Sequence, residues 1–221
     1  MEVNKPKVCG ACGRDGAPLK CPCKSEMYCN EECQRQKWGE HRPKCTVHLK
    51  KKLEKERARV GRDDKAVGFA AGELGVLFRD QDRLDEAAEW MEEALRIFRV
   101  VHGESHWDVA IALGDLGDIY RRQGKVEEAL ATHKQELRIA RRVHGNESKE
   151  VADALNSVAL CLKEQGLYDR AMKKYEEAHE MFRSLFGEDH EKVAMVLGNM
   201  ATVLDKQDKD AEALAMEEKA L

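Results

Sequence analysis

The sequence has few aromatic residues and no long apolar run. Phe, Trp and Tyr make up 5% of the 221 residues, whereas charged residues make up 36%. This composition disfavours a β-sandwich and favours helices that pack through Ala, Leu and Val. No stretch of about 18 apolar residues is present, so we expect no membrane-spanning helix. The first residues also lack an apolar segment, and the sequence therefore does not predict a secretory signal peptide.

Acidic residues are scarce at the N-terminal end and abundant afterwards. Residues 1–62 hold 16 Lys and Arg against 8 Asp and Glu, a net charge of +8. The remaining residues hold 22 against 34, a net charge of −12, so the whole chain carries −4. This asymmetry predicts two units with different surfaces.

Soft metal ligands are concentrated in the basic part. Seven of the eight cysteines lie between Cys9 and Cys45, and His41 lies among them. Their spacings are C-x2-C, C-x-C, C-x3-C and H-x3-C, which give two sets of the four ligands that a structural zinc ion binds. Without a secretory signal, we interpret them as zinc ligands in a reducing compartment, the cytoplasm or the nucleus, rather than as disulfides or reactive thiols. Zinc binding would supply the folding energy of this short polar segment.

The order of these ligands, in CGACGRDGAPLKCPCKSEMYCNEECQRQKWGEHRPKC (residues 9–45), resembles a MYND-type zinc finger. The resemblance implies two interleaved zinc sites. The first zinc would be held by Cys9, Cys12, Cys29 and Cys33, and the second by Cys21, Cys23, His41 and Cys45. The family usually has C-x2-C where this chain has Cys21-Pro22-Cys23, so one residue is missing from the second site. His48 is an alternative ligand if one of that pair cannot reach the ion.

The same resemblance implies a binding activity, because such fingers recognise short proline-containing peptides. Gln34 and Trp38 match the family positions that line the peptide groove. A Trp ring offers a flat face to a polyproline II peptide, and its N–H and the Gln amide offer hydrogen bonds. The alternative interpretation is that Trp38 packs against the zinc-held loops as a small core, and both can hold for different faces of the ring.

A basic segment follows the finger. Residues 46–62 carry seven Lys or Arg and two Glu, and Val47, Leu49 and Leu53 give the segment a sparse apolar side. We interpret it as a solvated connecting helix. A nucleic-acid-binding patch or a nuclear import signal is the alternative, but the segment has no aromatic residue for base stacking. The expected regions are a finger over residues 1–46, a basic helical linker over 47–65 and a repeat domain over 66–221.

The repeat domain has a step of 42 residues. Within one repeat, the apolar residues Val109, Leu113 and Leu116 define one helix face, and a second helix follows a short turn around Gly124. One helix pair cannot bury its apolar face, so the pairs are expected to stack into a solenoid. Three full repeats begin near residues 66, 108 and 150, and a partial one begins near 192. The step is kept by the small residues Gly75, Gly117, Ala159 and Ala201, and by Ala87, Ala129, Ala171 and Ala213.

The stretch LGDLGDIYRRQGKVEEAL resembles tetratricopeptide repeats, and the 42-residue step resembles the longer kinesin-light-chain subtype. The resemblance implies a mainly α fold with a concave groove lined by the first helix of each repeat. It places Arg79, Arg121 and Lys163 at one groove position, with Asn156 on the same helix face. This basic ladder predicts an acidic partner segment, and the alternative interpretation is an ordinary solvated face.

These features together predict a zinc-binding, non-enzymatic adaptor that binds proteins at the finger and in the groove. One alternative is a relative or fragment of a MYND-containing lysine methyltransferase, although the 20 residues between Cys45 and Ala66 cannot hold its catalytic domain. Another is a weak nucleic-acid-binding regulator. Leu221 falls inside the second helix of the fourth repeat, so we also expect self-association through this unfinished edge. Cys161 is interpreted as a core residue, and the histidines near the repeat junctions as loop or capping residues.

Overall fold

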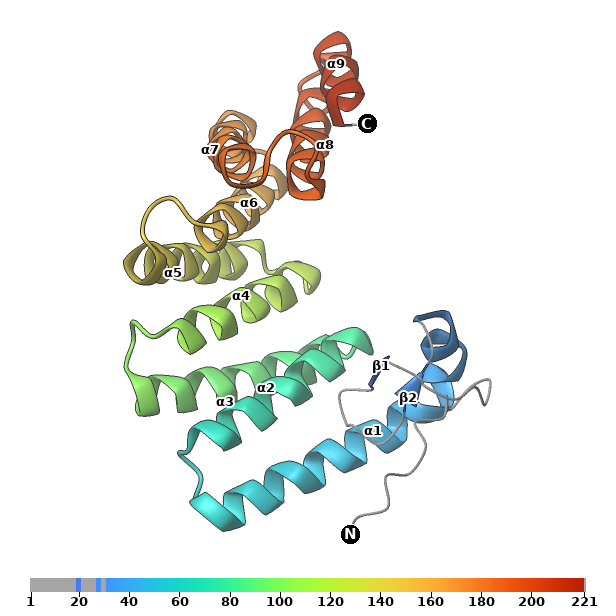
Figure 1. The fold of residues 1–221 in the computed structure, drawn as a ribbon, viewed down its shortest axis with the longest axis vertical. Coiled ribbons are helices and arrows are strands. Elements are labelled where there is room, and N and C mark those ends of the chain that lie inside the picture. The colour runs from blue at the N-terminus through green and yellow to red at the C-terminus, as the bar shows by residue number, and fades with distance from the viewer. Residues whose placement is uncertain (1–18, 21–26, 29–30, 221) are drawn as a thin grey trace. The chain divides into compact units, whose positions relative to one another are not determined.

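The structure is a computed structural model that describes residues 19–20, 27–28 and 31–220, with side chains from 46 to 219. The chain forms two compact units, one of residues up to Ile97 and one of residues from Phe98 onward. Both are built mainly from helices (Figure 1). The fold class expected from the sequence is therefore confirmed.

The first unit begins with a short antiparallel pair of strands. Strand β1 (Leu19–Lys20) pairs with β2 (Met27–Tyr28), and Leu19 lies opposite Tyr28. Helix α1 follows as one uninterrupted element of 30 residues, Glu31–Val60. It therefore crosses the boundary that the sequence placed between residues 46 and 47, so the last part of the finger and the linker share one helix.

The linker part of α1 packs against the first repeat instead of standing in solvent. The side chains of Leu49 and Leu53 are each 1% exposed. Gln81 donates a hydrogen bond to the Thr46 hydroxyl at 3.2 Å, and Lys52 forms an ion pair with Glu73. The expectation of a solvated connecting helix is corrected here, because two leucines one turn apart are enough to bury one side of the segment.

The helices after α1 form pairs that repeat every 42 residues (Figure 1). The first helices begin at residues 65, 107, 149 and 191, each one residue before the start predicted from the sequence. The pairs are α2 (Lys65–Asp80) with α3 (Leu84–His102), α4 (Trp107–Arg122) with α5 (Val126–His144), α6 (Lys149–Glu164) with α7 (Tyr168–Phe186), and α8 (Glu191–Asp205) with α9 (Asp210–Ala220).

Helix boundaries recur because the residues that cap the helices and form the turns also recur every 42 residues. Each first helix is capped by the residue directly before it. The side chain of that residue accepts a hydrogen bond from a backbone N–H of the first turn. Those caps are Asp64, His106, Ser148 and His190. The turn inside each pair places one residue at positive φ, which Gly and Asp tolerate. Those residues are Asp82, Gly124, Gly166 and Asp208. The loop or capping interpretation of the junction histidines is confirmed for His106 and His190, whereas His102 and His144 are the last residues of α3 and α5.

The core is filled by small and aliphatic side chains. Val109, Leu113 and Leu116 are at most 3% exposed, as their spacing predicted. Cys161 is fully buried, and burial raises the pKa of its thiol to about 12, so it stays protonated and serves the core. Among the described helices, none combines the length and the apolarity needed to cross a membrane.

The packing of α1 makes a stability prediction. Replacing Leu53 with Ala leaves a cavity between α1 and α2, and we expect the free energy of unfolding to fall by about 2–5 kcal/mol. Val47→Ala is the control on the same helix, because Val47 is 54% exposed, and it should change stability little. Urea unfolding followed by circular dichroism measures both. Equal small effects would show that α1 does not depend on this contact.

Candidate functional site

The predicted finger residues fall mostly outside the part of the chain whose side chains are described. The backbone of α1 includes five of them, namely Cys33, Gln34, Trp38, His41 and Cys45. The others, Cys9, Cys12, Cys21, Cys23 and Cys29, lie outside the described residues. The donor set itself, seven thiols and one imidazole, is the set that zinc prefers in structural sites.

The polar side chains of the predicted basic ladder bond to neighbouring residues. In the second unit, Arg121 donates a hydrogen bond to Glu164 at 3.0 Å, so an acidic side chain from the next repeat neutralises it. The Lys163 ammonium donates to the Thr202 hydroxyl at 3.1 Å, and burial lowers the pKa of this lysine.

The two remaining ladder residues also bond to neighbours. The Asn156 amide oxygen accepts from Asn199 at 3.0 Å. In the first unit, Arg79 lies 3.4 Å from the Asp80 carboxylate. These polar groups therefore bond within the protein. Arg79 and Arg121 lie beside carboxylates, whereas Lys163 keeps its charge beside a neutral hydroxyl.

A pocket in the second unit has the opposite charge. We call it the α4–α6 pocket, because its walls come from α4, α5 and α6, and its volume is about 290 Å³. Five of its eleven lining residues carry carboxylates, whereas one lysine lines it. The carboxylates belong to Asp115, Asp118, Glu136, Glu150 and Asp153, and the other lining residues are Trp107, Ile111, Gly114, His133, Lys149 and Ser157.

The wall of this pocket contains a buried pair of titratable side chains. The His133 side chain is 2% exposed, and its Nδ1 lies 2.8 Å from Oε2 of Glu136, whose side chain is 15% exposed. Burial raises the pKa of the Glu136 carboxyl, and the hydrogen bond with His133 partly opposes this effect. The other ring nitrogen, Nε2, has no hydrogen-bond partner and lies 3.9 Å from Oδ1 of Asp118.

Two glycines on α4 make room for this pair. A Cβ atom at Gly114 would lie 2.8 Å from the Glu136 carboxylate, and one at Gly117 would lie 2.6 Å from His133 Nε2. Both distances are shorter than side chains tolerate, so an alanine at either position would force the His133 or Glu136 side chain to move.

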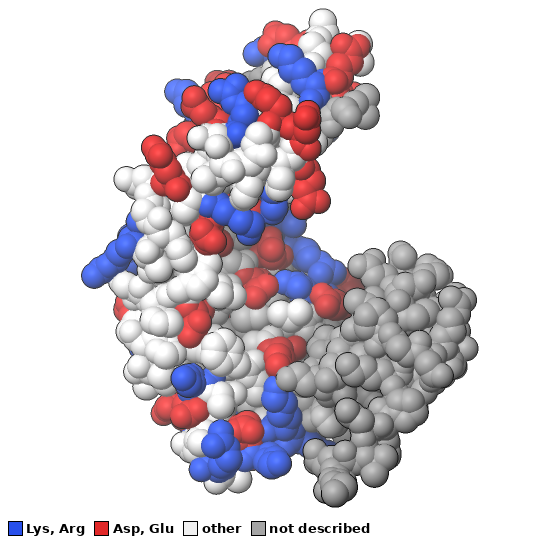
Figure 2. Space-filling view, viewed as in Figure 1, with Lys and Arg blue, Asp and Glu red and all other residues white. Residues whose placement is uncertain are grey.

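Lysine side chains near the pocket are already engaged. Lys149 and Lys192 both bind the carboxylate of Asp153, at 3.0 Å and 2.7 Å. Among the described residues, Glu150 has no ion-pair partner. On the face drawn in Figure 2, acidic and basic side chains are interleaved.

This site was not predicted from the sequence, although the repeat register held a signal for it. At the register position of Glu136 the neighbouring repeats have Ala94 and Ala178, both buried. At the position of His133 they have Met91 and Tyr175. A charged residue that replaces a buried alanine in one repeat only is a departure that packing alone does not explain.

The buried carboxyl makes a pH-dependent prediction. A carboxyl whose folded-state pKa is raised contributes stability below its unfolded value of 4.5, and the contribution is lost as the pH rises through the folded-state value. Glu136→Gln cannot ionise, so the stability of this variant relative to the wild type should increase from acid to neutral pH. Thermal unfolding between pH 4 and pH 8 tests this. The control is Glu176→Gln, at an exposed position of α7, whose stability relative to the wild type should change little with pH. A stability of Glu136→Gln relative to the wild type that falls as the pH rises would contradict the prediction.

Comparisons with known proteins agree with both sequence patterns. The tetratricopeptide repeat family matches residues 67–142 and 150–221, and the MYND finger family matches residues 8–45. Among solved structures, the chain resembles BtubC (BKLC) from P. vanneervenii at 22% identity, over 86% of this chain and 74% of that one, with a TM-score of 0.74. It also resembles the TPR-like repeats of a putative kinesin light chain from Podosopora anserina at 16% identity, over 86% and 90%, with a TM-score of 0.72. The comparison with curated proteins gives no match.

Proposed function

Because the chain belongs to the tetratricopeptide repeat family and carries a MYND finger, a zinc-binding domain, we propose that it is an adaptor with two binding surfaces. One surface is the finger and the other is the α4–α6 pocket. Both kinds of domain are protein-interaction modules that are typically non-catalytic, and the chain is proposed to act by binding. Cysteine thiols kept as zinc ligands suit a reducing compartment, which we propose to be the cytoplasm or the nucleus.

At the finger, two structural zinc ions are proposed. Cys9, Cys12, Cys29 and Cys33 would hold the first, and Cys21, Cys23, His41 and Cys45 the second. Gln34 and Trp38 then present an amide and an indole ring to a proline-containing peptide. The two residues are four apart, and their backbone belongs to α1, so they occupy the same side of that helix.

At the pocket, the proposed partner presents a lysine or arginine side chain. The observation that carries this proposal is the excess of carboxylates around a buried ring nitrogen that lacks a hydrogen bond. A cationic N–H group placed near Asp118 would compensate the carboxylates and contact the edge of His133. Trp107 and Ile111 supply apolar surface for the aliphatic stem of such a side chain.

This charge preference is opposite to the acidic partner expected from the ladder. The difference arises because Arg121 is paired with Glu164, whereas Lys163 keeps its charge beside the neutral Thr202 hydroxyl. The carboxylates of the pocket outnumber its cations, and the electrostatic field of a cleft follows that local balance.

The finger proposal is tested with Trp38→Ala. Short peptides that contain proline, and matched peptides with alanine in its place, are presented to the full zinc-loaded chain. We expect the variant to lose at least about 1 kcal/mol of binding free energy for the proline peptides, because the ring supplies most of the contact area. Zinc content per chain is the control and should not change. Equal binding by both proteins would exclude Trp38 from the peptide surface.

The pocket proposal is tested with a pair of fluorescent Gly-Ser peptides, one carrying spaced arginines and one with citrulline, the neutral analogue, in their place. The wild-type chain should bind the arginine peptide and not the citrulline peptide. The double variant Asp118→Asn, Glu150→Gln should bind it about three to ten times more weakly, because two charge pairs at the rim are lost. Fluorescence anisotropy measures both.

A matched control separates the pocket from the general acidity of the chain. The double variant Glu176→Gln, Glu217→Gln removes the same charge at exposed positions on α7 and α9. It should bind the arginine peptide as the wild type does. If this control loses as much affinity as the pocket variant, the peptide recognises net charge and the pocket proposal is wrong. The finger proposal would be unaffected by that result.

A further inference from the structure

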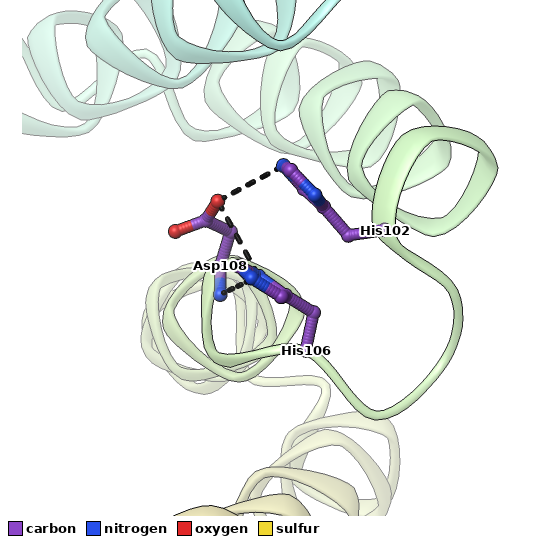
Figure 3. Close-up of side chains that lie close together, drawn as sticks. All are labelled: His102, His106 and Asp108. Atoms are coloured by element: carbon purple, nitrogen blue, oxygen red, sulfur yellow. Dashed lines mark hydrogen bonds and ion pairs between the residues drawn. The ribbon is translucent and has the colours of Figure 1, made fainter.

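Three potential metal ligands meet where α3 ends and α4 begins. His102 is the last residue of α3, His106 caps α4, and Asp108 lies in its first turn (Figure 3). His102 Nε2 lies 3.3 Å and His106 Nδ1 lies 3.4 Å from the same carboxylate oxygen, Oδ2 of Asp108. One donor atom from each residue lies within 4.8 Å of the other two. All three residues belong to the second unit.

These distances suit an ion bound between the donors. Ligand atoms around a tetrahedral ion with bonds of 2.0–2.1 Å are about 3.3–3.5 Å from one another. The spacings between the carboxylate oxygen and the two ring nitrogens agree with that separation. Two imidazoles and one carboxylate form a donor set that suits Zn²⁺ and other divalent transition metals.

Ring packing does not explain why residue 102 is a histidine. The His102 and His106 rings stack with centroids 4.1 Å apart. Phe186 and His190 lie two repeat steps after His102 and His106. Their rings stack with centroids 4.4 Å apart, and His190 caps its helix as His106 does. A phenyl ring therefore serves the stack equally well. In addition, His102 Nε2 is shielded from solvent and has no hydrogen-bond partner of suitable geometry.

We propose that His102, His106 and Asp108 bind a divalent transition metal ion, with Zn²⁺ as the first candidate. The ligands are His102 Nε2, His106 Nδ1 and Asp108 Oδ2. The ion takes the place of the hydrogen bond that His106 Nδ1 accepts from the Asp108 N–H at 3.1 Å. The His106 side chain is 44% exposed, so the ion reaches the site from solvent and keeps at least one position for water.

Such an ion would tie the end of α3 to the start of α4. The ligands come from both sides of the loop that contains Gly103, so binding requires the folded junction. An ion that binds only the folded state stabilises it by mass action, and the effect grows with the free ion concentration. The second unit would therefore become more stable as free zinc rises. This site is separate from the finger and from the α4–α6 pocket.

The test uses the full chain with its finger saturated with zinc. Equilibrium dialysis against micromolar free Zn²⁺ is followed by elemental analysis of zinc per chain. The variant His102→Phe copies the stacked pair at Phe186 and His190, so it should fold, and it should bind one zinc fewer than the wild type. Asp108→Asn should show the same loss. In parallel, the melting temperature of the wild type should rise with free zinc more than that of either variant.

The control is His144→Phe, which alters the histidine at the same register position of the next junction. It should keep the wild-type zinc content, because the residues one step on from His106 and Asp108 are Ser148 and Glu150. Equal zinc content in the wild type and His102→Phe would overturn the proposal. A loss of the same size in His144→Phe would also overturn it, since the ion would then bind elsewhere.

Discussion

The close approach of the two helices in each repeat is the constraint on which the rest of the structure depends. A Cβ atom at Gly75 would lie 3.3 Å from the backbone of α3, so only a small residue allows that contact. Ala159 and Ala201 are fully buried at the same register position. Because helix packing of this kind is set by side-chain size, a run of small residues at a fixed step specifies a run of similar helix pairs.

The same constraint produces the site in the second unit. Gly114 and Gly117 leave more space on α4 than an alanine would, and the His133 and Glu136 side chains fill it. A buried carboxyl of this kind is unfavourable for stability, because burial disfavours its charged form. Side chains whose position lowers the stability of a fold are more easily explained by a role in binding than by a role in packing. The side of α4 that carries Gly114 and Gly117 is therefore where the repeat fold and the proposed function meet.

Much of the fold was predictable from the sequence, and the reason is local. The step of 42 residues places caps, turns and small residues at the same points of each repeat, so the start of each first helix could be placed within one residue. Docking of α1 was not predictable from its composition, because Leu49 and Leu53 are a sparse pattern that becomes significant only when α2 is beside it. The α4–α6 pocket was missed because its residues come from three helices. Within the repeats, the contrasts of Glu136 with Ala94 and Ala178, and of His133 with Met91 and Tyr175, marked it.

The repeat register does not show which polar side chains of successive repeats bond to one another. A ladder of like residues on successive first helices suggests a row of free charges. In a stacked repeat, however, each polar side chain also faces the next repeat, at a sequence separation close to the step. Arg121 bonds to Glu164, Asn156 to Asn199 and Lys163 to Thr202, at separations of 43, 43 and 39 residues. These bonds between repeats engage the same polar side chains that the sequence suggested would bind a ligand. What a partner meets is the charge that remains after this pairing. At the α4–α6 pocket Asp153 is paired with two lysines and Asp118 lies 3.9 Å from Arg121, so the negative remainder that we propose there rests mainly on Glu150 and Glu136.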